Sequence, residues 1–160
     1  MKLIALLIGA LAAHGALAQT REQEVRARGP LVMPFSLHAT THVFTKTPDG
    51  GVQKVLVKNL SETNQRDLVQ VHLRHIAAAF SAGDFSGPSA LHGDGMPGLA
   101  RLKAAPPGAV SIKYAPLANG AQITYSTKDA ALQAALHAWF DAQLSDHGSD
   151  ATSGHAHHGH

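Results

Sequence analysis

The sequence predicts an α+β fold, in which two β-hairpins form a four-stranded antiparallel sheet and two main helices pack on one face of it. Two hairpin signals and two long helical patterns alternate along the chain, in the order hairpin, helix, loop, hairpin, helix. With 160 residues, of which 44% are hydrophobic, the chain can form one domain with a substantial core. We place this single domain at residues 35–147.

The N-terminus has the pattern of a secretory signal peptide. Met1-Lys2 is a short basic start, residues 3–11 are apolar, and Ala16-Leu17-Ala18 supplies the small residues that a signal peptidase reads. We expect residues 1–18 to be a signal peptide cleaved before Gln19, because the apolar run is too short to span a bilayer comfortably. The mature protein is then periplasmic or secreted, without a stable membrane anchor.

Two segments flank the predicted domain. Residues 19–34 are polar, and a solvated linker is favoured over a short helix there. Residues 148–160 read GSDATSGHAHHGH, a low-complexity tail that cannot build a core and is expected to be disordered. Without a fixed geometry, its histidines are expected to bind Cu(II), Ni(II) or Zn(II) opportunistically. They are His155, His157, His158 and His160.

The first hairpin is predicted from a strand, a turn and a second strand. Residues 40–47 are rich in β-branched and aromatic side chains, and the turn signal Pro48-Asp49-Gly50-Gly51 and the strand pattern of residues 52–58 follow. Because successive side chains of a strand point to opposite faces, His42 and Phe44 are expected to share one face.

The clearest helix is predicted at residues 61–82, with Ser61 as its N-cap and Gly83 as its stop. His72 lies at the border of its apolar stripe and can reach inward as a ligand, whereas His75 is expected to face water. The stripe itself repeats at spacings of four, three and four residues and consists of Val69, Leu73, Ile76 and Phe80.

The loop Leu91–Gly98, in the middle of the domain, is a candidate metal site. It places an imidazole, a carboxylate and a thioether among three glycines and a proline, which let the backbone turn tightly. His92 and Met96 together favour copper over magnesium or calcium, and Asp94 is a supporting carboxylate. The alternative is a connecting loop in which Met96 packs in the core and His92 faces solvent.

The second hairpin and the last helix complete the domain. Residues 110–125 alternate around the turn Asn119-Gly120. A Ser/Thr cap and an acidic residue then open a helix over residues 130–144. His137 and Asp141 stand four residues apart on it, so the carboxylate can fix which imidazole nitrogen faces a metal. An exposed His–Asp pair is the alternative.

Histidine is over-represented, with 12 residues in a chain that has no cysteine. The lack of cysteine removes disulfides, thiolate metal sites and cysteine nucleophiles. The histidines of the domain fall on different elements, which is typical of a site assembled by folding. We expect a metal site drawn from His42, His72, His92, Met96, His137 and His147, with Asp94 and Asp141 behind the ligands.

These features predict an exported protein that binds a transition metal, with copper favoured over zinc or nickel, and that buffers, sequesters or delivers it. The expected partners are the metal ion and a metal exporter or other envelope protein. With a formal charge of +2 and no basic stripe, nucleic-acid binding is not expected. Two alternatives stay open: a small metal-dependent hydrolase or lyase, although no catalytic motif is present, and an envelope interaction module without a metal site.

Three runs resemble a family of small exported proteobacterial proteins often labelled aspartate carbamoyltransferase: Thr41–Gly51, Leu91–Leu99 and Leu136–Gly148. The S-T-R-T and H-P-x-Q phosphate-binding motifs of true carbamoyltransferases are absent, so the resemblance implies no particular reaction. It implies a shared fold and a shared site at His42, His92, Met96, His137, Asp141 and His147.

Overall fold

The computed structural model describes the chain from residue 9 to residue 155, with side chains described from residue 21 onward. Within this part of the chain there are five α-helices and a five-stranded mixed sheet, which confirms the α+β class. The helices are α1 (Gly9–Val32), α2 (Thr63–Ser81), α3 (Ser86–His92), α4 (Leu99–Lys103) and α5 (Ala130–His147). The strands are β1 (Thr40–Thr47), β2 (Gly50–Val57), β3 (Ser111–Leu117), β4 (Gly120–Ser126) and β5 (Ala151–Ser153).

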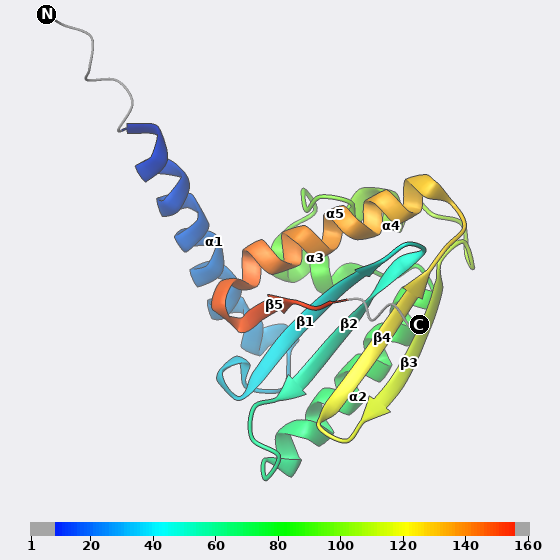
Figure 1. Cartoon of the computed structure of the whole chain (residues 1–160), viewed down its shortest axis with the longest axis horizontal. Helices are drawn as coiled ribbons and strands as arrows, with labels where there is room; N and C mark the ends of the chain where they lie inside the picture. Colours follow the sequence, from blue (N-terminus) through cyan, green and yellow to red (C-terminus); the bar gives the residue numbers. More distant parts are fainter. Residues whose placement is uncertain (1–8, 156–160) are drawn as a thin grey trace, which may run out of the picture.

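The sheet has the strand order β3-β4-β2-β1-β5 (Figure 1). Both predicted hairpins are confirmed, because β1 runs antiparallel to β2 and β3 runs antiparallel to β4. The two hairpins join through the antiparallel pair β2 and β4. Four adjacent strands of the sheet therefore have the predicted antiparallel arrangement.

Strand β5 corrects the predicted sheet and the predicted tail. It pairs parallel to β1, with His42 opposite Ala151, so the sheet has a fifth strand and is mixed. The tail that was expected to be disordered from residue 148 is ordered through Ser153. The physical reason is the edge of β1, whose N–H and C=O groups would be unpaired without β5. Residues 156–160 lie outside the described part of the chain.

Glycine begins the second strand of each hairpin and lets the two hairpins lie close together. Gly50 has φ +154° and Gly120 has φ +155°, which residues with side chains rarely adopt. A Cβ atom at Gly50 would collide with the main-chain carbonyl of Tyr125, and one at Gly120 with that of Val55. The glycines of the predicted turns therefore also permit the β2–β4 pairing.

Helices α2 and α5 pack on the same face of the sheet, as predicted (Figure 1). Aromatic side chains join them: the rings of Phe80 on α2 and Trp139 on α5 lie 5.7 Å apart in a T-shaped arrangement. Tyr125 of β4 lies 5.7 Å from Trp139, and Phe44 of β1 lies 5.2 Å from Phe140. Such pairs contribute about 0.5–1.5 kcal/mol each beyond the burial of their area.

Helix α2 begins at Thr63, two residues later than predicted. Ser61 is not its N-cap, because the Ser61 hydroxyl and N–H both donate to the Asn59 side chain, at 2.9 and 3.0 Å. The helix ends before Gly83, which has φ +80°. The buried stripe is confirmed except that Ile76 is only partly buried, and its fully buried residues are Val69, Leu73, Ala77 and Phe80.

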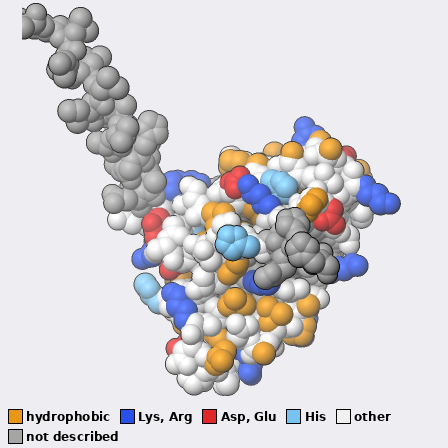
Figure 2. All heavy atoms as spheres, in the orientation of Figure 1, with side chains coloured by type: hydrophobic (Ala, Val, Ile, Leu, Met, Phe, Trp, Pro, Cys, Tyr) orange, Lys and Arg blue, Asp and Glu red, His pale blue; other side chains and the backbone are white. Residues whose placement is uncertain are grey.

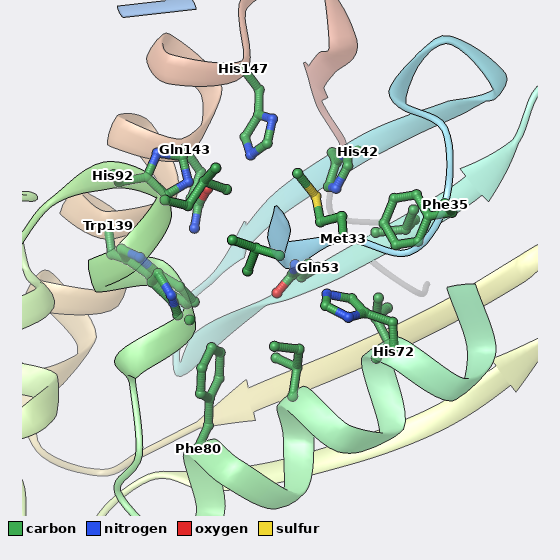
Figure 3. Close-up of a pocket in the computed structure, with 17 residues that line it drawn as sticks. Met33, Phe35, His42, Gln53, His72, Phe80, His92, Trp139, Gln143 and His147 are labelled. Carbon is green, nitrogen blue, oxygen red and sulfur yellow. The ribbon is translucent and has the colours of Figure 1, made fainter. Parts of the chain in front are cut away.

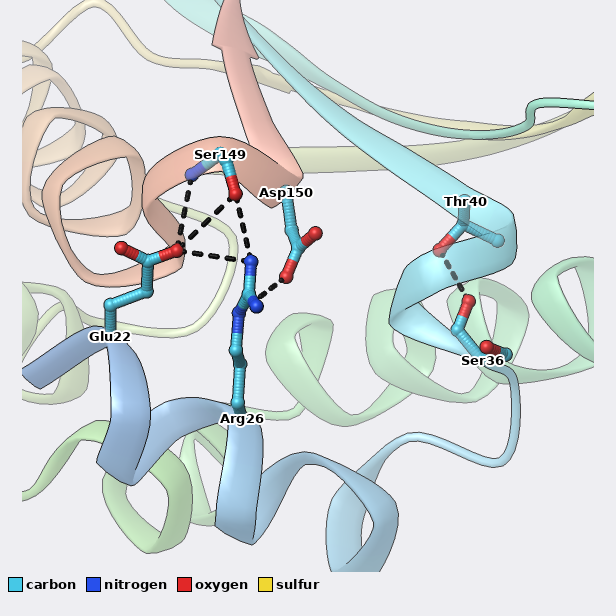
Figure 4. Close-up of polar contacts among 6 residues, drawn as sticks. All are labelled: Glu22, Arg26, Ser36, Thr40, Ser149 and Asp150. Atoms are coloured by element: carbon cyan, nitrogen blue, oxygen red, sulfur yellow. Dashed lines mark hydrogen bonds and ion pairs between the residues drawn. The ribbon is translucent and has the colours of Figure 1, made fainter.

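The segment predicted as a solvated linker is mostly the second half of α1, which packs against α3 and α5. Val25 is only 2% exposed. Arg26 ties the helix to the C-terminal segment, since it contacts Glu22 at 3.1 Å, Ser149 at 2.8 Å and Asp150 at 3.2 Å (Figure 4). These C-terminal partners lie far along the chain, so a polar local composition gave no sign of them.

Within residues 9–155, no helix combines the length and the apolar character that crossing a membrane requires. The predicted cleavage point before Gln19 falls inside α1. Arg21, two residues after that point, contacts the His92 carbonyl and Asp146 of the domain.

Candidate metal site

Four histidines from four different elements line one cavity of about 60 Å³ between the sheet and the helices (Figure 3). They are His42 of β1, His72 of α2, His92 of α3 and His147 of α5. Among the described residues, no Asp, Glu, Lys or Arg side chain lines this cavity. Its wall also contains Met33, Phe35, Gln53, Phe80, Trp139 and Gln143.

Local structure turns the imidazoles inward. The alternation of β1 puts His42 on the face that the helices cover. His92 and His147 are each the last residue of a helix, and a glycine with positive φ follows each: Gly93 at +83° and Gly148 at +52°. Glycine ends helices in this way because it has no Cβ to clash. Both imidazoles therefore lie at carboxyl ends of helices, where the helix dipole is negative.

His147 lies between two other buried imidazoles. Its ring is 4.7 Å from that of His42, stacked at 16°, and 5.3 Å from that of His92, at 70°. Each of the three residues is only 3% exposed. We refer to His42, His92 and His147 as the histidine cluster. His72 stands further out, partly buried, with its ring edge-on to Phe35 at 5.5 Å.

A carboxylate paired with an arginine orients His92. Asp146 Oδ2 lies 2.9 Å from His92 Nδ1 and 3.0 Å from Arg21 Nη2. Because a carboxylate accepts a hydrogen bond from a protonated Nδ1, the neutral ring carries its lone pair on Nε2. Arg21 also donates to the His92 carbonyl at 3.1 Å. A carboxylate in this position is the usual support of a metal-binding histidine.

Two nitrogens of the cluster have no partner. His42 Nδ1 and His147 Nδ1 are buried, and no group of the described residues forms a hydrogen bond with them. Buried polar atoms without a partner are rare, and each costs about 1–3 kcal/mol. The cluster therefore has a binding capacity that the described protein groups do not use.

The imidazoles around the cavity are neutral at pH 7. Burial lowers the pKa of His42 to about 4 and the pKa of His72 to about 4. Burial also lowers the pKa of His147 well below its usual 6.5, and it lowers the pKa of His92 although Asp146 opposes that shift. A neutral imidazole keeps a lone pair, so this is the form that binds metal ions.

Two predicted ligands lie away from the cavity. Met96 packs in the apolar core, as in the connecting-loop alternative, but His92 does not face solvent as that alternative expected. His137 Nε2 lies 3.0 Å from the carbonyl oxygen of Thr47 and 2.9 Å from that of Gly50. It therefore donates to the first hairpin turn, and its hydrogen-bonding role is structural.

The two predicted supporting carboxylates lie at the surface, and on the face shown in Figure 2 acidic and basic side chains are likewise scattered over the surface. Asp94 pairs with Lys103 at 3.0 Å and is 80% exposed, and Asp141 pairs with Lys46 at 2.6 Å and is 61% exposed. The predicted role belongs to Asp146, which reaches His92 from another helix. His137 and Asp141 stand four residues apart on α5 as predicted, but the Asp141 carboxylate pairs with Lys46 of β1.

The described residues contain no complete ligand set made of imidazoles and carboxylates alone. Among residues 21–155, no three His, Asp or Glu side chains are placed to hold one ion together. His155 belongs to the described tail and is exposed. The other predicted tail ligands, His157, His158 and His160, lie outside the described residues.

Sequence reasoning missed four residues at or behind the cavity: Arg21, Met33, Gln143 and Asp146. Arg21 and Met33 fall in the segment taken for a linker. A local signal for the cluster did exist, because the pair His-Gly occurs at the ends of both α3 and α5. A histidine just before a helix-ending glycine lies at the negative end of the helix dipole, a favourable position for a cation.

No protein-family model, curated protein or solved structure matches the chain. The resemblance noted in three runs of the sequence stays a prediction. The functional argument therefore depends on the geometry of this chain alone.

Proposed function

We propose that the protein is exported and binds a transition-metal ion at the histidine cluster, with copper favoured over zinc and nickel. The protein would buffer, sequester or deliver that ion in the periplasm. The observation that carries this proposal is the pair of buried Nδ1 atoms, on His42 and His147, that have no partner. A bound cation would give these two nitrogens the partner that no hydrogen-bonding group of the described residues supplies.

Three further features support a cation at this position. The imidazoles are neutral, so no proton has to leave before an ion binds. Asp146 holds the His92 ring from behind. Two helix carboxyl ends meet here, and cations near such ends gain about 0.3–1 kcal/mol, or up to about 2 kcal/mol where partly buried.

The cavity favours this proposal over the two alternatives. An interaction module would have its histidines spread over the surface, whereas the three cluster residues are each 3% exposed. A hydrolase or lyase would use an acidic or basic side chain beside its metal, and among the described residues no Asp, Glu, Lys or Arg side chain lines this cavity.

The metal-binding part is tested by titration with Cu(I), Cu(II), Zn(II) and Ni(II) in a background where His155, His157, His158 and His160 are replaced by asparagine. We expect one ion per chain and a raised melting temperature, because a ligand that binds only the folded state stabilises it. Loss of stoichiometric binding in this background would overturn the proposal and leave binding to the tail alone.

The export part is tested by the mass of the protein recovered from the periplasm of a Gram-negative host. Cleavage before Gln19 is expected. A chain that stays in the cytoplasm with residues 1–18 attached would contradict it.

A further inference from the structure

The lining of the cavity carries no formal charge. Its polar side chains are imidazoles, two glutamine amides and an indole, and no Asp, Glu, Lys or Arg side chain of the described residues reaches its wall. Asp146, which contacts the His92 ring, already pairs with Arg21 at 3.0 Å. No charged ligand at the cavity wall would therefore neutralise a bound ion, and only the dipoles of neutral groups would stabilise its charge.

This neutrality discriminates between ions of different charge. The cost of moving an ion from water into a low-dielectric site grows with the square of its charge, so a divalent ion costs about four times as much as a monovalent ion of equal size. No anionic ligand lines the cavity to compensate for that cost. The environment consequently favours a monovalent ion.

A soft ligand stands at the same cavity. Met33, just after the end of α1, is 5% exposed and lines the cavity with the imidazoles, and Figure 3 shows its thioether among them. Thioether sulfur selects soft ions, and Cu(I) is a soft monovalent ion. Among the described residues the other soft candidate, Met96, does not line this cavity.

The number of ligands fits the same ion. No three His, Asp or Glu side chains of residues 21–155 can hold one ion together, so a four- or six-coordinate divalent ion has no full set of protein ligands here. Cu(I) has a filled d shell and accepts two or three ligands. Two imidazoles and one thioether are enough for it.

We infer that the histidine cluster is a site for monovalent copper, with the Met33 thioether as a ligand beside the cluster imidazoles. The inference depends on the proposed metal-binding function and specifies the ion and one ligand. Binding transfers no electron, because the ion enters and leaves as Cu(I). A reductant in the assay only keeps it in that state.

The test compares two buried methionines in the full chain with the tail histidines replaced. Cu(I) affinity is measured without oxygen, by competition with a chromophoric Cu(I) chelator, and Zn(II) affinity with a zinc dye. We expect Cu(I) to bind at least about 100-fold more tightly than Zn(II). Met33→Leu should weaken Cu(I) by about tenfold or more and leave Zn(II) unchanged. Met96→Leu, at a residue that is 3% exposed in the core, should change neither affinity.

X-ray absorption of the Cu(I) form gives an independent readout, with a sulfur neighbour expected in the parent chain and in Met96→Leu but absent in Met33→Leu. This measurement on the parent chain also decides the matter if Met33→Leu does not fold. Equal affinities for Zn(II) and Cu(I), no sulfur neighbour, or equal effects of the two substitutions would overturn the inference. Binding of any ion at the cluster would then still support the proposed function, whereas no binding at all would remove both.

Discussion

The two histidines of α5 lie ten residues apart in the same helix and have different roles. His137 donates to the carbonyl oxygens of Thr47 and Gly50, at 3.0 and 2.9 Å, and ties the helix to the first hairpin turn. His147, at the helix end, is 3% exposed, and its buried Nδ1 has no hydrogen-bond partner among the described residues. The contrast shows that partners, more than burial, separate a structural histidine from a candidate ligand.

The two aspartates of α5 near these histidines differ in the same way, in their burial and in their partners. Asp141 is 61% exposed and pairs with Lys46, an arrangement worth about 0–1 kcal/mol at a surface. Asp146 is buried at the helix end and is shared by His92 and Arg21, both within 3.0 Å. A His–Asp spacing along one helix therefore says little until the partners across the fold are known.

The largest expected effect is the loss of stability at acidic pH, because the buried histidines of the cluster fold in their neutral form. The pKa of His42 is about 4 in the folded protein against a usual 6.5, so between these values the unfolded chain binds more protons. The free energy of unfolding should therefore fall as the pH drops from 6.5 towards 4, by roughly 3 kcal/mol for His42 alone. Denaturant unfolding of the metal-free protein between pH 7 and pH 4 measures this loss.

The matched control for that measurement is His42→Phe, which keeps a ring but does not titrate. Its unfolding free energy should depend less on pH above pH 5, where the carboxylates are still ionised. Identical pH profiles for the two proteins would mean that the cluster does not fold in its neutral form.

Replacing the unpartnered histidine should separate binding from stability. We expect His147→Leu to weaken metal binding by at least about 100-fold, since outer groups alone are worth 10–100-fold at such sites. Its unfolding free energy without metal should stay level or rise, because a buried nitrogen without a partner is removed. Titration and thermal melting measure the two effects, and a fully destabilised variant that still binds metal would contradict both expectations.

The two aspartates offer a sharper version of the same contrast. Asp146→Asn should weaken metal binding by about 10–100-fold, because the amide cannot orient and polarise His92 as the carboxylate does. Asp141→Asn should leave the affinity unchanged. If the titration showed an unchanged affinity for both variants, the contact of Asp146 with His92 would have no role in metal binding.

The smallest effect is expected at the structural histidine. His137→Leu should lower the free energy of unfolding by about 1–2 kcal/mol, because two carbonyl oxygens of the hairpin turn lose their donor. Metal affinity should not change. Denaturant unfolding and titration of the same preparation check this, and weakened binding with unaltered stability would place His137 in the site after all.

Local signals in the sequence account for most of the fold. The alternation and turn glycines of both hairpins, the apolar stripe of α2 and the start of α5 each lie within a short window, and each element formed within a few residues of its expected bounds. The cap of α5 is Asp129, whose side chain accepts from two N–H groups of the first turn, in place of the expected Ser/Thr. The first half of the C-terminal tail and the segment before residue 35 were misjudged. Their order comes from β1, α3 and α5, which no window around them contains.

The same limit explains the site. The sequence by itself determined that histidines are abundant, that cysteine is absent and that His42 shares a strand face with Phe44, because composition and strand alternation are local properties. Only the tertiary structure decided that His42, His92 and His147 meet, that Asp146 rather than Asp141 or Asp94 supports them, and that Met33 rather than Met96 lines their cavity. The physical reason is that which side chains become neighbours depends on how separate elements pack, and packing is decided by the summed burial of the whole core.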